Sequence, residues 1–427
     1  MKIVITGHKD SLNVGNMVML LGLMNGVSRR LGEAEVMLLS DLPEEDRCRY
    51  GEIPSLTIVL RPWYRQQRAS WLSMAIALFY LAYGLVHTGI NRLTRGTIQL
   101  PLPKILRLFA EADLLVDISG DDLTSAYGVF SLLQVVYELL LARLFGLKTV
   151  LLAQAAGPFT GIPMRLAGWA VGHLVDLITF RDATSWALWQ GMAARLPRRS
   201  QPVCRLTGDL VHLVPMPPSG VMADHGPIIV NLSTYIIRKG HGEKTFLDRD
   251  EGQKGAIGQW IQLLQRIHDH TNREILLLGH TFRHGTGDDR VFLRVLYHQL
   301  SRDFPVRFPD RMMTTGEIQR LVAQSSFVIG SRMHLALTAL CCHVPFLALA
   351  YSHKYDQLKA KKRYPVCPVL AVERQGDESL PLALFERFRQ LWDGRKPFKA
   401  AIRQHAEEAK KKSEENFDQL LYMIRDG

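Results

Sequence analysis

The segment from Ser325 to Lys354 holds the residues of this 427-residue chain that are best suited to bind and transform a small molecule. A short apolar run stops at Gly330, and Ser331, Arg332 and His334 follow it. An arginine guanidinium binds a carboxylate or phosphate through two parallel hydrogen bonds, and a histidine transfers protons near neutral pH. The spacing therefore predicts an anion site in which Arg332 and His334 are catalytic and Ser331 binds substrate.

A second polar group, Tyr351-Ser352-His353-Lys354, follows the next apolar run. We expect Tyr351 and Lys354 to bind substrate at the same site. The alternative is structural, with Arg332 capping a helix and His334 serving as a hydrogen-bonded core residue. An isolated Arg-x-His favours that alternative, whereas the glycine, the turn and the second polar group favour a functional site.

Alternating strands and helices must position these residues. Phe327-Val328-Ile329 is typical of a buried strand, a helix is predicted from His334 to Cys342, and the next strand runs from Phe346 to Ala350. In an open parallel sheet, ligands bind at the carboxyl ends of the strands, close to helix N-termini. The segment therefore predicts a doubly wound α/β unit whose strand ends carry the site.

The first half of the chain repeats this pattern. Strands are predicted at Lys2–Thr6, Asp113–Ile118, Leu147–Ala153 and Leu174–Phe180, and small or polar residues follow each of them. The candidate substrate-binding residues in these turns are Asn13, Gly15, Asn16, Gly120, Asp121, Asp122, Gln154 and Arg181.

Each of these candidates has an alternative role. Asparagine and glycine are the expected residues of any turn. Arg181 either binds a substrate carboxylate or pairs with Asp182 at a helix start. Asp121 and Asp122 can bind a sugar hydroxyl, a helix N-terminus or a metal, and the lack of a third ligand at a fixed spacing argues against the metal.

A second α/β unit begins near Pro227. Its first strand ends at Asn231, a candidate substrate-binding residue, and the strand from Glu274 to Leu278 leads to His280, a second candidate acid or base. His284, Asp288 and Asp289 follow closely, but they lack the spacing of a metal-binding motif. We therefore expect no metal.

The length of the chain predicts two domains. Pro215, Pro217, Pro218 and Gly220 interrupt regular structure and indicate a linker. We predict an N-terminal domain at 1–212, a linker at 213–226, a C-terminal domain at 227–400 and a terminal helix at 401–427.

Charge and cysteine content limit the partners and the compartment. The net charge of +11 favours anionic substrates or an acidic membrane surface. Nucleic acid ranks low, because no zinc-finger spacing, aromatic RNA-binding motif or long basic run is present. The five cysteines form no C-x-x-C pair, which is typical of reduced thiols in a cytosolic protein.

Residues 61–107 form a distinct insertion. The stretch from Trp71 to Ile90 contains no Asp, Glu, Lys or Arg, and as a helix it is about 30 Å long, which spans a bilayer. Basic residues flank it on both sides: Arg61, Arg65, Arg68, Arg92, Arg95, Lys104 and Arg107. Because this symmetry argues against a single crossing, we predict a helix or helical hairpin that enters the cytosolic membrane face. A buried core helix is the alternative.

In order and spacing, these motifs resemble the polysaccharide pyruvyl transferase family. The matching pieces are N-x-G-N at Asn13–Asn16, ADLLVDISGDDL at Ala112–Leu123, AQAAGPF at Ala153–Phe159, FRDATS at Phe180–Ser185, TGD at Thr207–Asp209, GH at Gly279–His280 and GSRMHLALTAL at Gly330–Leu340. Two pieces depart from the family pattern: the first motif ends in Asn16 instead of Asp, and Ser119-Gly120 replaces a pair of glycines.

The resemblance implies two Rossmann-like domains facing across a cleft, as in GT-B glycosyltransferases, and no cofactor. It implies that phosphoenolpyruvate forms a pyruvyl ketal on a sugar of a cell-surface polysaccharide or its lipid-linked precursor, and releases phosphate. Arg332 would hold the donor, Arg181 would assist, and His334 or His280 would carry the proton. The enzyme would be cytoplasmic, or peripheral to the inner membrane face.

Two other functions remain open. One is a GT-B glycosyltransferase that uses a nucleotide sugar, and it would release a nucleotide instead of phosphate. The other is a non-catalytic, membrane-associated component of polysaccharide assembly, an alternative that Asn16 keeps open. The acceptor sugar, its linkage and the oligomeric state do not follow from the sequence.

Overall fold

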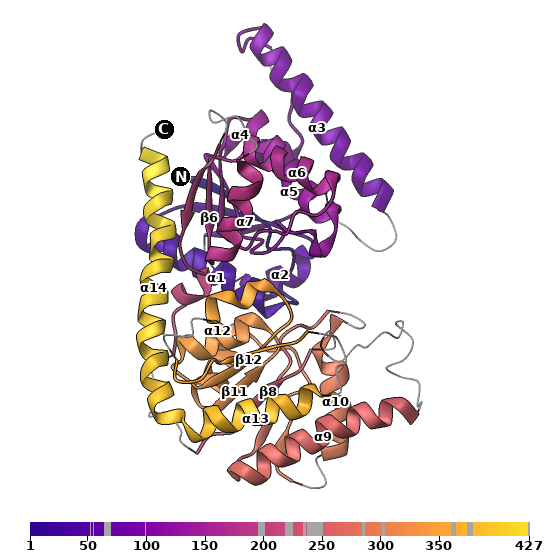
Figure 1. Ribbon diagram of the computed structural model, residues 1–427. Helices are drawn as coiled ribbons and strands as arrows, with labels where there is room; N and C mark the ends of the chain where they lie inside the picture. Colours follow the sequence, from indigo (N-terminus) through magenta and orange to yellow (C-terminus); the bar gives the residue numbers. More distant parts are fainter. Residues whose placement is uncertain are drawn as a thin grey trace. The chain divides into compact units, whose positions relative to one another are not determined.

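The computed structural model describes the chain except residues 52, 54, 64–69, 99, 195–200, 218–224, 234–235, 237–250, 284–286, 301–303, 360–363, 374–378 and 426–427, and it describes only the backbone of residues 70–71 and 251–256. The chain forms two compact units (Figure 1). The first comprises Met1–Ser11, Met19–Leu213 and Lys411–Gly427, and the second comprises Leu12–Val18 and Val214–Lys410. Each unit therefore contains a short segment that lies far away in the sequence, and part of the predicted linker, 218–224, lies outside the described residues.

The first unit is built on a seven-stranded parallel sheet in the order β3-β2-β1-β4-β5-β6-β7. Its strands are β1 (Lys2–Thr6), β2 (Glu35–Ser40), β3 (Leu56–Leu60), β4 (Leu114–Asp117), β5 (Lys148–Gln154), β6 (Leu177–Phe180) and β7 (Val203–Leu206). Its helices are α1 (Val14–Arg30, whose first turn belongs to the second unit), α2 (Pro43–Tyr50), α3 (Ser70–Leu93), α4 (Lys104–Glu111), α5 (Val129–Leu144), α6 (Ile162–Leu174) and α7 (Ala183–Ala193).

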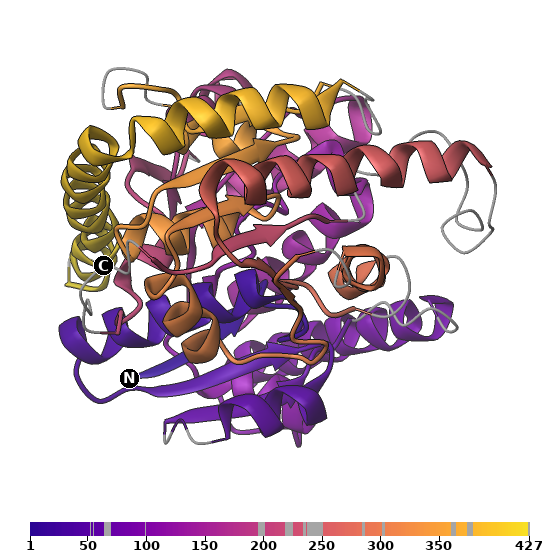
Figure 2. The ribbon, with the colours of Figure 1, turned by 90° about the horizontal axis from the view of Figure 1, so that it is seen from below.

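The second unit is built on a six-stranded parallel sheet in the order β10-β9-β8-β11-β12-β13. Its strands are β8 (Ile228–Asn231), β9 (Ile275–Leu277), β10 (Val306–Arg307), β11 (Phe327–Gly330), β12 (Phe346–Ala350) and β13 (Val369–Ala371). Its helices are α9 (Glu251–Thr271), α10 (Asp289–Leu300), α11 (Thr315–Ala323), α12 (Met333–Cys341), α13 (Leu380–Asp393) and the first part of α14 (Arg395–Arg425). Helices α9 and α13 run side by side on one face of this sheet (Figure 1, Figure 2).

Both sheets have the strand order of a doubly wound fold, which confirms the predicted α/β class. The central strands β1, β4, β8 and β11 are rich in β-branched and large apolar residues and buried along nearly their whole length, as expected where helices cover both faces of a parallel sheet. The order reverses between β1 and β4 in the first unit, and between β8 and β11 in the second. Such reversals open a crevice at the carboxyl ends of the strands, where ligands bind.

Helix α3 carries its apolar residues on the outside. Ser73 and Ala77 are buried, whereas Leu78, Phe79 and Leu85 are 59%, 56% and 55% exposed. Only 17% of the most apolar 18-residue window of this helix is buried, although the helix is long and apolar enough to cross a membrane. The alternative of a buried core helix is therefore wrong.

The basic flank of this insertion differs from the expectation. Arg61 is 2% exposed and lies in the first unit beside Glu138 and Asp41, at 3.4 and 3.3 Å from their carboxylate oxygens. It is thus an internal cation that follows β3, and it cannot meet a lipid surface. Burial, opposed by the charge of Arg61, raises the pKa of Glu138 to about 7. Arg65 and Arg68 lie outside the described residues.

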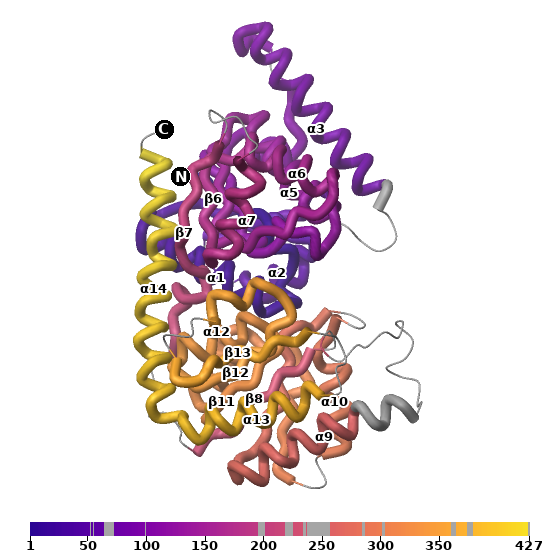
Figure 3. The backbone as a smooth tube through the Cα atoms, in the orientation of Figure 1, coloured from indigo at the N-terminus to yellow at the C-terminus, as the bar shows by residue number. Residues whose placement is uncertain are grey.

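The C-terminal part of α14 is a structural part of the first unit, beside β7 (Figure 3). Asn416 is fully buried there: its Nδ2 donates to the carbonyl oxygen of Gly208 at 2.9 Å, and its Oδ1 accepts from the hydroxyls of Thr179 and Thr207 at 2.5 and 2.8 Å. The predicted terminal helix therefore joins the ends of β6 and β7 through one amide side chain.

We expect Asn416→Ala to lower the free energy of unfolding by about 2–4 kcal/mol, because it leaves several buried polar groups without partners. Gln404→Ala on the exposed face of the same helix removes only a surface contact with Glu408, and it should change that energy by less than about 0.5 kcal/mol. Urea denaturation of both variants measures the difference. Equal unfolding midpoints would show that the amide has no stabilising role.

Candidate active site

The carboxylate of Asp289 lies at the centre of the site in the second unit. Asp289 is the first residue of α10 and is fully buried. It accepts hydrogen bonds from the backbone N–H groups of His280 and Thr281, both at 3.1 Å, and from Nδ2 of Asn231 at 3.2 Å. These bonds join the residues that follow β9 to the carboxyl end of β8.

Arg332 completes the shell of this carboxylate. Its Nη2 donates to Oδ1 of Asp289 at 2.6 Å, and its Nε lies 3.2 and 3.3 Å from the two carboxylate oxygens. Burial disfavours the cation, but the charge and hydrogen bonds of Asp289 outweigh burial, and the pKa of Arg332 lies above its ordinary value. No described residue accepts a hydrogen bond from Nη1. One edge of the guanidinium is thus held by the protein, and the other edge remains for an anion.

Asn231 and Ser331 use their polar atoms within the protein. Both are fully buried, and the Ser331 hydroxyl donates to Oδ1 of Asn231 at 3.0 Å while accepting from the backbone N–H of Ser233 at 2.7 Å. Asn231 also donates to the carbonyl oxygen of Leu278 at 2.9 Å. These two predicted binding residues therefore hold the ends of β8 and β11 together, beneath the residues that can meet a ligand.

His280 is a buried and neutral imidazole. It is 1% exposed, and neither of its ring nitrogens has a hydrogen-bond partner among the described residues. Burial, reinforced by the nearby His334 and Arg332, holds the pKa of His280 well below its ordinary value. Such an imidazole can accept a proton or a hydrogen bond, but it does not store a proton at neutral pH.

His334 packs against the segment Leu12–Val18. A Cβ atom at Gly15 would lie 2.6 Å from Nδ1 of His334, so only glycine lets the backbone approach the ring this closely. The segment is fixed by hydrogen bonds from Val14 N–H to the carbonyl oxygen of His280, at 3.0 Å, and from Gly15 N–H to Oδ1 of Asn13, at 2.9 Å. The structure thus brings Asn13 and Gly15, and with them the adjacent Asn16, into the unit that carries both histidines.

Tyr351 and Lys354 lie at the end of β12 in the same unit. The Nζ of Lys354 is 5.0 Å from the centre of the Tyr351 ring. Burial acts to raise the pKa of Tyr351, but the positive charges of Lys354 and Arg332 outweigh burial and lower it. The phenol therefore lies in the positive field that an anionic substrate would meet.

The first unit has its own buried carboxylate at the reversal of strand order. Asp117 accepts from the Thr6 hydroxyl at 3.1 Å, from the Ser119 backbone N–H at 2.9 Å and from Nε2 of Gln154 at 3.1 Å. Gln154 is fully buried, and its Oε1 accepts from the Ser119 hydroxyl at 3.1 Å. The side-chain amide of this predicted binding residue is therefore hydrogen-bonded within the protein, where it joins β4 to β5.

Asp121 and Asp122 follow this carboxylate and differ in exposure. Asp122 is 2% exposed and pairs with Nζ of Lys9 at 2.6 Å. Burial raises its pKa, although Lys9 opposes the shift. Asp121 is half-buried and accepts from the Tyr127 hydroxyl at 2.7 Å. Asp121 is therefore the carboxylate of this turn that is open to solvent.

Arg181 pairs with the buried Asp209 of the T-G-D motif, with Nη1 and Oδ2 at 3.0 Å. Asp182 instead caps α7, accepting the backbone N–H of Ser185 at 2.7 Å. Gly120 has φ +75°, and a Cβ there would lie 3.3 Å from Nη1 of Arg181, so the glycine turn and the guanidinium are neighbours. The alternative role predicted for Arg181, an ion pair with Asp182, is therefore wrong. Its ion-pair partner is Asp209, 28 positions away.

Sequence reasoning did not assign a role to Asp289, Asp117 or Lys9. Asp289 had a signal, because it belongs to an acidic pair beside the predicted histidine. Asp117 and Lys9 had none, because Asp117 binds Thr6 and Gln154 on other strands and Lys9 pairs with Asp122, 113 positions away. Among the described residues, no group of three His, Cys, Asp or Glu side chains could hold a metal ion.

A family model described as polysaccharide pyruvyl transferase matches residues 13–353 of the chain. No curated protein sequence matches the chain. Among solved structures, the chain is similar to UDP-GlcNAc 2-epimerase from Methanocaldococcus jannaschii, with a TM-score of 0.57 and 9% identity over 99% of this chain and 100% of that chain. It is also similar to sucrose-phosphate synthase from Thermosynechococcus elongatus, with a TM-score of 0.56 and 12% identity over 99% and 98% of the two chains.

A third similar structure is HepE from Anabaena in complex with UDP-glucose, with a TM-score of 0.54 and 11% identity over 99% of this chain and 100% of that chain. At such low identity these structures show the fold alone, and that fold is GT-B-like.

The buried His280 predicts acid sensitivity. Its pKa is depressed in the folded state, so below pH about 6.5 only the unfolded chain takes up the proton, and stability falls as the pH falls. We expect His280→Gln to reduce the slope of unfolding free energy against pH between 7.0 and 5.5, by up to about 1.4 kcal/mol per pH unit. Urea denaturation across this range measures the slope.

His212 provides a matched control, because burial lowers its pKa to about 4. His212→Gln should reduce the slope in the same way, and the double variant should reduce it further. An unchanged slope in His280→Gln would contradict a neutral, buried His280.

Proposed function

Because the chain belongs to the polysaccharide pyruvyl transferase family and is a transferase, we propose that it transfers a pyruvyl group from phosphoenolpyruvate to a sugar of a cell-surface polysaccharide or its lipid-linked precursor. The observation that carries the proposal is the arrangement around Asp289, which places a fixed guanidinium and two imidazoles in one unit. The family match includes all of these residues.

The reaction has a defined balance of bonds. C3 of the enol gains a proton, and C2 becomes an oxocarbenium-like centre that one sugar hydroxyl attacks. A second hydroxyl of the sugar then replaces the phosphate at C2. This step breaks the bond between C2 and the bridging oxygen, which leaves with the phosphate. One hydroxyl proton balances the proton at C3 and the other leaves with the phosphate, so the products are a pyruvate ketal and free phosphate.

The residues of the second unit fit these needs. The free edge of Arg332 would bind the carboxylate or the phosphate of the donor, because Asp289 orients the guanidinium. His334 is half-buried and is the better placed to deliver a proton, whereas the neutral His280 is suited to accept one. Lys354 would add positive field near the donor, and the Tyr351 hydroxyl would lie in that field as a hydrogen-bond donor. In the first unit, Asp121 and Gly120 would meet the sugar.

One assay tests the proposal. The purified chain is incubated with phosphoenolpyruvate and glycolipids from a bacterial cell envelope, and released phosphate is measured together with the mass of the glycolipids. We expect phosphate release and a mass gain of one pyruvyl ketal. Nucleotide release from UDP-sugars, with none of the phosphate signal, would instead indicate a glycosyltransferase, and no reaction with either donor would favour a non-catalytic component.

Arg332→Lys tests the donor site. Lysine keeps a positive charge beside the buried Asp289, so the fold should survive, but a point charge cannot hold Asp289 and a donor oxyanion in two fixed directions. We expect kcat/KM for phosphoenolpyruvate to fall by about 10–150-fold, corresponding to roughly 1.5–3 kcal/mol for a hydrogen bond to a charged group. Arg332→Ala is a poorer test, because it leaves a buried carboxylate without its cation. Wild-type kinetics in the lysine variant would remove Arg332 from donor binding.

We also propose that the enzyme works at the cytosolic face of the membrane. The exposed apolar face of α3 would lie among acyl chains, where burial is favourable by about 25 cal/mol per Å². Arg92 in the last turn of this helix and Arg95, Lys104 and Arg107 beyond it are exposed and would each add roughly 1 kcal/mol near anionic lipid. A lipid-linked acceptor would be presented at this surface.

Charged residues on α3 should abolish membrane binding. We expect the wild-type protein to sediment with vesicles that contain phosphatidylglycerol, and the triple variant Leu78→Glu, Phe79→Glu, Leu85→Glu to bind at least about 100-fold more weakly, because each apolar side chain contributes about 1.5–3 kcal/mol when buried. Leu382→Glu on α13, where the leucine is 57% exposed, is the matched control and should bind as the wild type does. A wild-type protein that stays in solution at low salt would disprove the membrane role.

A further inference from the structure

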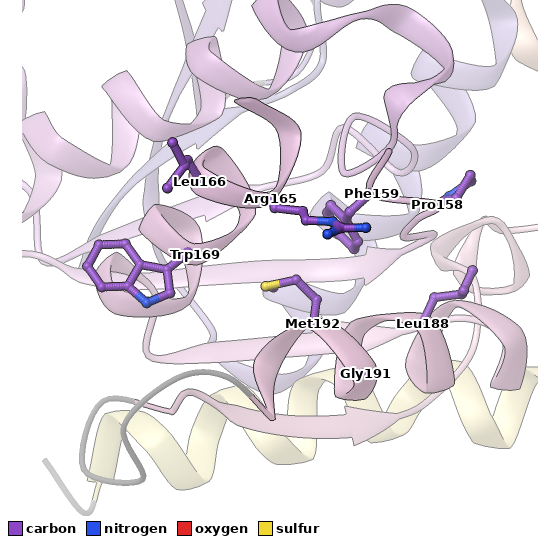
Figure 4. A pocket seen from close by; sticks show the side chains of 8 residues that line it. All are labelled: Pro158, Phe159, Arg165, Leu166, Trp169, Leu188, Gly191 and Met192. Carbon is purple, nitrogen blue, oxygen red and sulfur yellow. The ribbon is translucent and has the colours of Figure 1, made fainter. Parts of the chain in front are cut away.

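A pocket of about 440 Å³ lies between α6 and α7 in the first unit (Figure 4). Its lining is largely apolar and includes Phe159, Trp169 and Met192, and Figure 4 shows Met192 pointing from α7 toward α6 and Leu188 pointing toward Pro158. The volume is in the usual range of sites for small organic ligands. Trp169 and Leu188 are 45% and 37% exposed, so these walls are open to a ligand.

Arg165 is the only charged residue among the eight that line the pocket. In the part of the chain that the structure describes, its guanidinium makes no ion pair and no side-chain hydrogen bond. A single unpaired cation on an apolar pocket suits a molecule with a hydrocarbon part and an anionic part. The apolar side chains account for the hydrocarbon, and Arg165 accounts for the anion.

The loop that forms one wall of the pocket is hydrogen-bonded to the segment that follows the turn proposed to meet the sugar. Pro158, in its wall, accepts hydrogen bonds on its carbonyl oxygen from the backbone N–H and the hydroxyl of Ser125, at 3.1 and 2.7 Å. The preceding Gly157 donates its backbone N–H to Leu123 at 2.7 Å. The segment Leu123–Ser125 follows Asp121 and Asp122 directly. The wall of the pocket and the turn that carries Asp121 are therefore neighbours in the first unit.

We infer that this pocket binds the hydrocarbon chain of the lipid that carries the acceptor sugar, with the lipid's phosphate at Arg165. The inference rests on the proposed function and deepens it by giving the acceptor its own binding site. This site takes one lipid molecule, and it is distinct from the apolar face of α3. The acceptor's sugar would then lie toward Asp121.

Binding of alkyl phosphates tests the site without any enzymatic turnover. Butyl, hexyl and octyl phosphate are titrated calorimetrically into the purified full-length protein, below their micelle-forming concentrations. We expect affinity to rise about fourfold per methylene group, since each buried methylene contributes that factor. Arg165→Gln should weaken octyl phosphate about tenfold or more and leave octanol unchanged.

Gly191 offers a way to fill the pocket. It lines the pocket on α7, and no atom lies within 4 Å of the position of an added Cβ, so Gly191→Phe should fold and occupy the space. We expect at least a 30-fold loss of octyl phosphate affinity. Gly258→Phe is the matched control, because Gly258 lies on α9 with equally open space and should leave the affinity unchanged.

The outcomes separate this site from the proposed reaction. If Gly191→Phe loses transfer to the lipid-linked acceptor but keeps transfer to the delipidated sugar, the site serves the acceptor. If no phosphate is released with any acceptor while octyl phosphate still binds, the proposed function fails and the lipid pocket stands. Affinity that is independent of chain length, or equal in wild type and Gly191→Phe, overturns the inference. So does a Gly191→Phe variant that loses only binding to phosphatidylglycerol vesicles, because the surface would then bind bulk membrane.

Discussion

The buried carboxylate of Asp289 is the constraint on which the geometry of the second unit depends. An ionised carboxylate without partners is too costly to bury, so its position requires the donors that surround it. Those donors come from the ends of β8 and β9 and from the turn after β11, which are the two sides of the sheet's reversal point. The same four partners that donate to Asp289 therefore determine where His280 lies and which edge of Arg332 is left without an acceptor among the described residues.

The first unit also buries a carboxylate, that of Asp117, and stabilises it with neutral hydrogen-bond donors. Asp117 receives hydroxyl, amide and backbone N–H groups from β1, β5 and the turn after β4, and none of the described arginines donates to it. Close packing accompanies it: a Cβ at Gly7 would lie 2.3 Å from the backbone nitrogen of Ser119, and Gly7 has φ +80°. This crevice is thus filled by protein near β1, and the half-buried Asp121 lies further along the turn, after the buried Gly120.

Local features of the fold followed from the sequence. Apolar runs placed β1 and β12 at their observed bounds. Strand ends identified most candidate residues, because polar residues after buried strands are a local pattern. Pairings across long separations did not follow: Arg332 with Asp289, Arg61 with Glu138 and Asn416 with Gly208 depend on how strands are ordered, which no local pattern encodes. The exposure of the apolar face of α3 did not follow from the sequence either, since an apolar helix without charged residues fits a protein core equally well.

The exposed apolar features lie in the first unit, and the charged residues around Arg332 lie in the second. This separation matches the different chemistry of the two proposed substrates. The second unit carries the charged groups that suit a small, soluble anion, and among its described elements apolar residues serve mainly its core. The first unit combines an apolar helix face, an apolar pocket with one cation, and a carboxylate turn. A water-soluble donor needs neither the apolar helix face nor the apolar pocket. An amphiphilic acceptor needs both, and it also needs a polar turn for its sugar: the helix face brings the enzyme to the membrane that holds the acceptor, and the pocket binds the acceptor's hydrocarbon chain. On the proposed function, the donor is therefore recognised by electrostatics in one unit and the acceptor by hydrophobic burial in the other, so variants of α3 or Gly191 act on the acceptor without altering the field around Arg332.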